Sequence, residues 1–397
     1  MELSKRGLAV EESATLAISA KAKAMKAEGL DVVDFGVGEP DFRTPEHICA
    51  AAEEAIRLGL THYTPASGTL ELRTAICEKL LKENSLKYTP RQVVVSNGAK
   101  HSLYNAFLAI LNPGDEVLIP SPCWVSYPEM IKMADGVPVL VHAGEEDGFL
   151  PTAAELDAAC TPRTKAIILN NPVNPTGAAF DNSELEKIAS MAVKRDLFVI
   201  SDEIYEALVY DGLRPVSIAS FGDDIKQRTI VINGVSKTYA MTGWRIGYAA
   251  AATEVAQVMA NIQSQATSNP NSIAQYASIA AMRGPKDVVD VMAAEFDRRR
   301  LRIHELVNRA PGMSAPLPRG AFYLFVNIKP LLGKKLRGLA LSDSMAFATA
   351  LLEEKHVATV PGSAFFAEGY VRLSYALSME HLEKGIQRMA EFAAMLE

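Results

Sequence analysis

Three short apolar runs decide the fold of this 397-residue chain: KAIILN at residues 165–170, LFVIS at residues 197–201 and TIVIN at residues 229–233. Each run is apolar on both faces, and stretches with helical spacing of apolar residues separate the runs. Such runs are typical of strands in a parallel or mixed sheet that helices cover. The pattern therefore predicts an α/β domain.

The same alternation extends outward from these runs in both directions. Further strands are predicted at 92–96, 116–120, 137–141 and 246–251, and helices at 46–59, 69–83 and 98–111. We therefore assign residues 46–285 to a large α/β domain, with a mixed, mostly parallel sheet and helices on both faces.

After Pro285 the pattern changes. A long charged helix is predicted at 286–310, and Pro311-Gly312 is its stop signal. We assign residues 286–397 to a smaller α+β domain and expect residues 1–45 to pack with it. The remaining elements predicted in this domain are strands at 321–327, 357–360 and 370–375 and helices at 342–355 and 379–396.

Composition and charge exclude several classes of protein. Hydrophobic residues make up 49% of the chain, and the formal net charge is −7, which argues against nucleic acid as a partner. The four cysteines form no C-x-x-C pair and no Cys/His cluster with zinc-ligand spacing, so we expect reduced thiols and no metal. Neither a signal peptide nor a membrane-spanning segment is predicted. We expect a cytoplasmic protein with no membrane partner.

Four polar segments follow predicted strands, at the edge where open α/β sheets bind ligands. Each alone has an ordinary structural explanation: a helix cap, a tight loop or a solvated lysine. Together they bring an acid, a tyrosine, an amide, a lysine and an anion-binding helix terminus to one edge. The segments are Asn97–Lys100, Asn171–Gly177, Asp202–Tyr205 and Gly234–Thr238, with Arg245 shortly after the last.

These residue types suit a cofactor that carries a phosphate, an aldehyde and a pyridine ring. The helix that opens at Gly98, Ala99 and Lys100 can bind a phosphate through free N–H groups. Ser236 and Arg245 can add a hydroxyl and a guanidinium to the same anion. A lysine can form a Schiff base with an aldehyde. An aspartate can keep a pyridinium nitrogen protonated, which makes the ring an electron sink. A tyrosine and an asparagine can hydrogen-bond a ring phenolate oxygen and lower the imine pKa.

Competing motifs do not fit. Gly36-Val37-Gly38 has Asp41 where a dinucleotide-binding fingerprint needs its third glycine. Ser236-Lys237-Thr238 resembles the end of a Walker loop, but no glycine precedes the lysine. There is neither a G-x-S-x-G elbow nor an H-E-x-x-H zinc motif.

Six ordered strings extend over nearly the whole chain, from about residue 13 to the C-terminus: VGEPDFRTP, SPCWVSYPEM, NNPVNPTG, SDEIYEALVY, SKTYAMTGWRIGY and VRLSYA. In these motifs and their order the chain resembles the class I aminotransferases of pyridoxal-phosphate fold type I, and most closely their bacterial aspartate aminotransferase subgroup. The resemblance implies pyridoxal 5'-phosphate as cofactor and a ping-pong exchange of amino groups.

The resemblance also implies a role for each matching residue. Lys237 matches the Schiff-base lysine, which also moves the proton between the substrate Cα and the cofactor. Asp202 matches the partner of the pyridine nitrogen, and Tyr205 and Asn174 match the pair on the ring oxygen. Trp124 matches the aromatic residue that stacks on the ring.

Further matches concern the phosphate and the α-carboxylate of the substrate. Gly98, Ala99, Lys100, Ser236 and Arg245 fall in the phosphate-site motifs. Tyr63 matches a tyrosine that reaches the phosphate of a neighbouring subunit, which implies a homodimer with shared active sites. Arg372 matches the arginine that binds the α-carboxylate, helped by Asn174 and the backbone of Gly38.

The resemblance points to dicarboxylic substrates less directly. Lys100 matches a lysine associated with the distal carboxylate, and Thr15 matches a substrate-side threonine. Many relatives have Lys-Pro where this chain has Glu11-Glu12, which argues against prephenate and slightly against aspartate. We hypothesise that aspartate/oxaloacetate and glutamate/2-oxoglutarate are the exchanged pairs. The alternatives are an aminotransferase for aromatic amino acids, alanine or prephenate, a C–S β-lyase, and a non-catalytic cofactor-binding regulator.

Overall fold

The computed structural model describes the chain except for residues 1, 9, 11–13 and 215. Its helices are α1 (Lys5–Leu8), α2 (Ala14–Ala27), α3 (Glu46–Arg57), α4 (Leu70–Asn84), α5 (Ala99–Ile110), α6 (Ser126–Met133), α7 (Ala153–Ala159), α8 (Asn182–Lys194), α9 (Asp223–Arg228), α10 (Thr253–Ala266), α11 (Ser272–Arg283), α12 (Asp287–Arg309), α13 (Ser344–Lys355) and α14 (Met379–Ala394).

The strands belong to one large sheet and three small ones. The large sheet contains β2 (Val93–Ser96), β3 (Glu116–Ser121), β4 (Val137–His142), β5 (Thr164–Asn170), β6 (Phe198–Asp202), β7 (Thr229–Gly234) and β8 (Gly247–Ala250). The small sheets contain β1 (Val33–Asp34), β9 (Tyr323–Asn327), β10 (Lys335–Leu336), β11 (Leu339–Ala340), β12 (Val357–Ala358), β13 (Val360–Pro361) and β14 (Tyr370–Ser374).

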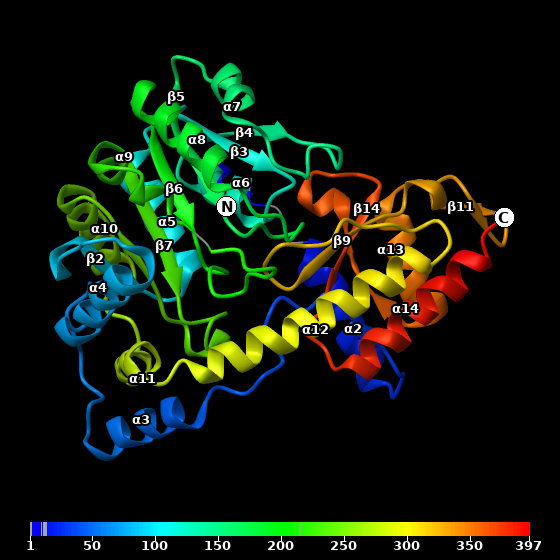
Figure 1. The fold of residues 1–397 in the computed structure, drawn as a ribbon, viewed down its shortest axis with the longest axis horizontal. Coiled ribbons are helices and arrows are strands. Elements are labelled where there is room, and N and C mark those ends of the chain that lie inside the picture. Colours follow the sequence, from blue (N-terminus) through cyan, green and yellow to red (C-terminus); the bar gives the residue numbers. More distant parts are fainter. Residues whose placement is uncertain (1, 9, 11–13, 215) are drawn as a thin grey trace.

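The large sheet confirms the α/β prediction. Its strand order is β2-β8-β7-β6-β5-β3-β4, and β8 alone runs opposite to the other strands of this sheet. Its strands are apolar on both faces because both are covered: α5, α6 and α10 pack on one, and α4, α8 and α11 on the other (Figure 1). Since β5, β6 and β7 are parallel neighbours, their carboxyl ends open at the same edge.

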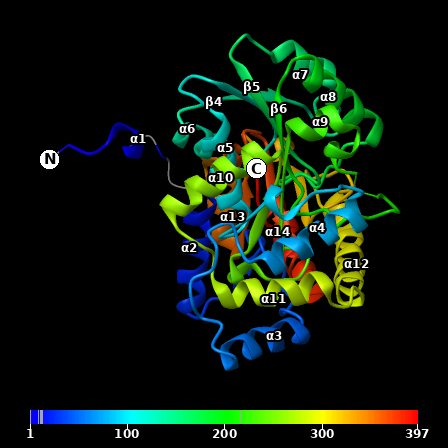
Figure 2. The same ribbon diagram turned by 90° about the vertical axis from the view of Figure 1, so that its left-hand side faces the viewer.

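A second group of elements lies beside that edge, as Figure 1 shows. The antiparallel sheet β13-β14-β9 packs with α12, α13 and α14 around one apolar core. The segment before residue 46 joins this group, because β1 pairs with β12 in parallel and Ile18 and Ala22 of α2 pack against α13. In the view of Figure 2, α2 lies on one side of this group and α12 on the other, with α13 and α14 between them.

One predicted strand is wrong in detail. The stretch 357–360 was expected to form a single strand, but it contains parts of two strands in different sheets: β12 pairs with β1, and β13 pairs with β14. All four residues are buried, so the run of apolar residues gave no sign of the break at Thr359.

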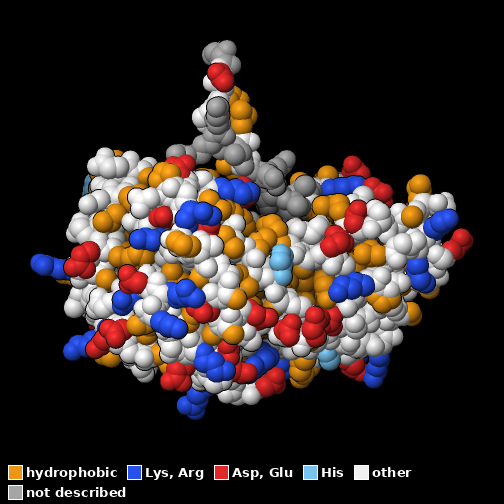
Figure 3. Space-filling view, turned by 90° about the horizontal axis from the view of Figure 1, so that it is seen from above, with side chains coloured by type: hydrophobic (Ala, Val, Ile, Leu, Met, Phe, Trp, Pro, Cys, Tyr) orange, Lys and Arg blue, Asp and Glu red, His pale blue; other side chains and the backbone are white. Residues whose placement is uncertain are grey.

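The surface shows no dominant charge on the face seen in Figure 3, where acidic and basic side chains are interspersed. Within the described part of the chain, no helix has both the length and the apolar character that crossing a bilayer requires.

Candidate active site

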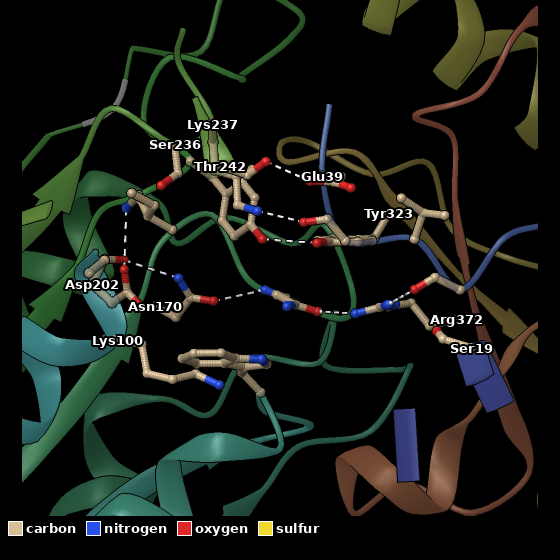
Figure 4. A pocket seen from close by; sticks show the side chains of 18 of the residues that line it. Ser19, Glu39, Lys100, Asn170, Asp202, Ser236, Lys237, Thr242, Tyr323 and Arg372 are labelled. Atoms are coloured by element: carbon tan, nitrogen blue, oxygen red, sulfur yellow. Dashed lines mark hydrogen bonds between the residues drawn. The ribbon is translucent and has the colours of Figure 1, made fainter. Parts of the chain in front are cut away.

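A cavity of about 470 Å³ lies where the carboxyl ends of β5, β6 and β7 face β9 and β14. Residues from α2, from the loop after β1 and from the start of α5 complete its wall. Figure 4 shows Asp202 and Arg372 on opposite sides of this space, with Lys237 between them in the view. The cavity therefore joins side chains from both groups of elements.

Asp202 is the last residue of β6, and its carboxylate is buried at the cavity wall. Its Oδ2 accepts a 2.6 Å hydrogen bond from the Tyr127 hydroxyl, and Oδ1 accepts one of 3.3 Å from the backbone N–H of Ile204. Burial raises the pKa of Asp202 to about 6, although both hydrogen bonds and the charge of Lys237 act in the opposite direction. A carboxylate held this way stabilises a positive charge placed beside it.

Lys237 follows β7 and is half-buried on the cavity wall. Its Nζ donates a 2.5 Å hydrogen bond to the backbone oxygen of Gly38, a neutral acceptor. Desolvation lowers the pKa of Lys237 to about 8; Glu39 opposes this shift, and the cations Arg372 and Arg245 add to it. An appreciable fraction of this lysine is therefore a free amine near neutral pH, as a nucleophile requires.

Arg372, on β14, is a buried guanidinium whose hydrogen bonds go to neutral groups. It donates to Oδ1 of Asn174 and to the carbonyl of Gly36, both at 3.0 Å, and its Cζ lies 4.4 Å from the centre of the Tyr323 ring. Its Nε has no hydrogen-bond partner in the described part of the chain. A buried charge with an unsatisfied N–H is costly, so the site fits an anionic ligand that would pair with Arg372.

The N-terminus of α5 forms an anion cradle with the loop before β8. Gly98 has φ +87°, and a Cβ there would collide with the guanidinium of Arg245. A Cβ on Gly247 would likewise collide with the backbone N of Ala99. Only glycine allows this close approach, and Ala99 and Lys100 in the first turn of α5 line the cavity. Ser236 also lines this cavity, so the donors fit a phosphate group.

Trp124 and Lys100 line the same cavity from its other side. The Nζ of Lys100 lies 4.7 Å from the centre of the Trp124 ring. Desolvation, and then the nearby Arg245, lower the pKa of Lys100. The donor set around the cavity thus offers a lysine for an aldehyde, a carboxylate for a pyridinium and a cradle for a phosphate, and these groups fit pyridoxal 5'-phosphate.

One residue predicted from the sequence, Tyr63, does not line this cavity, and the predicted Thr15 has a side chain outside the described part of the structure. Tyr63 is 93% exposed and lines a separate surface hollow with Asn269. Thr15 lies in the first turn of α2, and Glu11 and Glu12 fall outside the described residues. The other predicted site residues lie at the cavity or in its anion cradle: Gly38, Gly98, Ala99, Lys100, Trp124, Asn174, Asp202, Tyr205, Ser236, Lys237, Arg245 and Arg372.

The structure adds site residues that the sequence analysis missed. Tyr127 lies in the quoted string SPCWVSYPEM, one helical turn after Trp124, so a closer reading could have found it. Asn170 ends β5, and its amide donates a 3.0 Å hydrogen bond to the carbonyl of Asp202. Tyr323 begins β9 of a small sheet and Gly36 lies in the turn after β1, and no strand-end rule of the large sheet points to either residue.

Known proteins resemble the chain along its whole length. The family model described as aminotransferase class I and II matches residues 30–389. An aspartate aminotransferase of Bacillus subtilis is 47% identical and covers 99% of each chain, and an aspartate/prephenate aminotransferase of Cereibacter sphaeroides is 48% identical over 98% of this chain and 97% of its own. Among solved structures, the aspartate aminotransferase of Rhizobium meliloti superposes with a TM-score of 0.97 at 43% identity, over 100% of both chains.

Proposed function

The chain belongs to the class I and II aminotransferases, and we propose that it exchanges amino groups between L-aspartate and 2-oxoglutarate in a ping-pong reaction. The observation that carries this proposal is the cavity that brings Lys237, Asp202 and Arg372 together. The family cofactor, pyridoxal 5'-phosphate, supplies an electron sink for the charge left when the substrate Cα–H bond breaks.

Lys237 has two tasks in this proposal. Its amine would hold the cofactor through the aldehyde until an amino acid binds. The amine, once free, would take the proton from the substrate Cα as a base and return a proton as an acid. A pKa of about 8 suits both directions of transfer near neutral pH.

Asp202 keeps the pyridine nitrogen protonated. Its hydrogen bond from Tyr127 favours the ionised carboxylate, and a pyridinium beside it would favour ionisation further. Tyr205 and Asn174 would hydrogen-bond the ring oxygen, and Trp124 would stack on the ring, since all three line the cavity.

Two sets of groups would bind the anions of the cofactor and of the substrate. The phosphate of the cofactor would be bound by Arg245, by Ser236 and by the N-terminus of α5 at Gly98, Ala99 and Lys100. Arg372 binds the substrate α-carboxylate with two N–H groups, aided by Asn174 and the backbone of Gly38.

Lys100 and Thr15 are proposed to bind the distal carboxylate of the substrate. The Nζ of Lys100 lies over Trp124, inside the same cavity as Arg372, which supports a substrate with a carboxylate at each end.

The remaining assignments concern the whole molecule. We assign residues 46–285 to a cofactor-binding domain and residues 1–45 with 286–397 to a small domain. Tyr63, exposed on the single chain, is proposed to complete the phosphate site of a second subunit in a homodimer. A cytoplasmic location remains a prediction.

An absorbance experiment tests the function. Purified protein loaded with pyridoxal 5'-phosphate should show a visible band that shifts on adding aspartate and returns on adding 2-oxoglutarate. A donor panel of aspartate, glutamate, alanine, phenylalanine and, for the reverse direction, prephenate identifies the substrate. Fast exchange with alanine or phenylalanine and none with aspartate would overturn the substrate assignment. Pyruvate release from a cysteine conjugate without an oxo acid would favour a β-lyase.

A further inference from the structure

Two buried phenols from different sheets meet inside the cavity. Tyr205 follows β6, and Tyr323 begins β9; their hydroxyl oxygens are 2.9 Å apart, and their rings pack edge to face at 5.8 Å. Both side chains are almost fully buried, with 5% and 1% of their surface exposed. Tyr323 is therefore the group of the small sheet in direct hydrogen-bond contact with Tyr205.

The ring of Tyr323 also contacts Arg372, the arginine proposed to bind the substrate α-carboxylate. The Cζ of Arg372 lies 4.4 Å from the centre of that ring, within cation–π distance. Burial raises the pKa of Tyr323, and the charge of Arg372 opposes this rise. The charge of Arg372 therefore makes the hydroxyl of Tyr323 a stronger hydrogen-bond donor than burial alone would leave it. One side chain thus touches both Tyr205 and Arg372.

The number of protons fixes the direction of the hydrogen bond once the cofactor is bound. A phenol has one proton to donate. If Tyr205 gives its proton to the ring oxygen of the cofactor, as in the proposed function, the contact between the two phenols has to use the proton of Tyr323. Two such hydrogen bonds in series polarise each other, so each becomes stronger.

We propose that Tyr323 is a positioning residue: it donates a hydrogen bond to Tyr205, strengthens the hydrogen bond of Tyr205 to the cofactor, and connects both to the α-carboxylate site at Arg372. This inference rests on the proposed function. Charge on Arg372 makes Tyr323 a better donor, and a bound substrate carboxylate reduces that effect. Binding of substrate is therefore transmitted to the cofactor oxygen through two phenols. The other charged groups that face the pair are Asp202 of β6 and Lys237 after β7, whose Nζ lies 5.9 Å from the centre of the Tyr205 ring.

The principal test is Tyr323→Phe in the cofactor-loaded protein, because it keeps the ring under Arg372 and removes only the hydroxyl. The weaker hydrogen bond of Tyr205 leaves more negative charge on the cofactor oxygen, which holds the neighbouring proton more tightly. The midpoint of the pH titration of the visible band should rise by about half a unit to one unit. The kcat for aspartate should fall about threefold to tenfold, the usual effect of one neutral hydrogen bond. The KM should stay within about twofold.

A second variant separates the ring from the hydroxyl. Tyr323→Leu removes both, so Arg372 loses its support. The affinity for succinate, a dicarboxylate that cannot react, should then fall about tenfold, measured by the absorbance change on binding. In Tyr323→Phe the affinity for succinate should match that of the wild type.

Two controls make the inference falsifiable. Tyr375→Phe removes another buried phenol, which donates to the carbonyl of Ala321 at 3.0 Å outside the cavity, and should leave the titration midpoint unchanged. In a Tyr205→Phe background, adding Tyr323→Phe should shift the midpoint no further, since Tyr323 acts through Tyr205. An equal shift in Tyr375→Phe, additive effects in the double variant, or a wild-type midpoint in Tyr323→Phe would overturn the inference. A wild type that binds no cofactor or exchanges no aspartate would instead refute the proposed function.

Discussion

Two lysines of this chain, Lys237 in the cavity and Lys79 beneath the sheet, have pKa values that are shifted in opposite directions. Lys79 of α4 is buried, with 9% of its surface exposed, and it donates to the Glu206 carboxylate and, at 2.8 Å, to Asn84. Lys237 is less buried and donates to a carbonyl. Desolvation lowers the pKa of both side chains. The pKa of Lys79 is nevertheless raised overall, chiefly by Glu206, whereas that of Lys237 falls to about 8.

The difference shows that a carboxylate partner, and not burial, decides what a lysine can do here. Glu206 and Lys79 form a structural ion pair, and amides of Asn84 and Asn233 donate to the same carboxylate at 2.6 and 2.7 Å. No such carboxylate contacts Lys237 in the described part of the chain, so its amine is available for chemistry.

The largest expected effect comes from Lys237→Ala. The variant loses both the nucleophile and the proton carrier, so turnover of aspartate with 2-oxoglutarate should fall by about 10⁴-fold or more. Borohydride should no longer fix the cofactor to the protein. The control Lys335→Ala removes an exposed lysine of β10 and should keep full activity. Retained turnover in the Lys237 variant would contradict the assignment.

The opposite outcome is expected for Lys79→Met. This change leaves Glu206 buried without its cation, and the free energy of unfolding should fall by about 3–5 kcal/mol, measured by urea denaturation. The double variant Lys79→Met/Glu206→Leu should recover only part of that loss, because the buried amides of Asn84 and Asn233 lose their acceptor. As a control, Lys21→Met breaks an exposed pair with Glu353 and should change stability little. A small effect of Lys79→Met would show that the pair is not structural.

Asp202→Asn tests the carboxylate opposite Lys237. The variant should still bind cofactor but lose about a hundredfold in turnover, because an amide stabilises the pyridinium poorly. Near-normal kcat would argue against the role of Asp202.

The same variant gives a pH signature without cofactor. The pKa of Asp202 is higher in the folded chain, at about 6, than its ordinary value of 3.8, so folding favours the protonated form. The free energy of unfolding of the wild-type apoprotein should therefore decrease as the pH rises from about 4 to about 6. The contribution of this group is on the order of 2–3 kcal/mol. Comparison with Asp202→Asn isolates that contribution, since the variant cannot ionise there. Identical pH profiles for the two proteins would refute the raised pKa.

The smallest expected effect concerns the reactivity of Lys237. With a pKa of about 8, its unprotonated fraction rises about tenfold from pH 7 to pH 9, and the rate of cofactor attachment to the apoprotein should rise with it. The reaction of the same cofactor with N-acetyl-lysine serves as the reference. A midpoint near the ordinary lysine value would show that Lys237 resembles a solvated lysine.

The apolar runs predicted much of the fold. The run 165–170 became β5 at Thr164–Asn170, and the charged helix predicted at 286–310 became α12 at Asp287–Arg309. These predictions are confirmed because strand and helix periods are local properties of the chain. The prediction was wrong at 357–360, where pairing with two different partners splits one apolar run.

From strand ends alone, the candidate site was predictable only where it follows the large sheet, whereas Arg372 and Gly38 lie outside that sheet and were predicted from the family resemblance. Asp202, Asn174 and Lys237 were found from the ends of strands, since parallel strands bring those ends to one edge. Tyr323 was not found, because the packing of the small sheet, and not a local signal, brings its hydroxyl to Tyr205 across 118 positions of sequence.

By itself, the sequence determined the strands and helices, the polar segments at their ends and the family of the chain, since periodicity and motifs are written in neighbouring residues. The tertiary structure alone decided which lysine keeps its proton. Glu206 lies 127 positions from Lys79, and Gly38 lies 199 positions from Lys237. A pKa depends on the charges and the solvent within a few ångströms of a group, and in this chain folding brings those charges from far along the sequence.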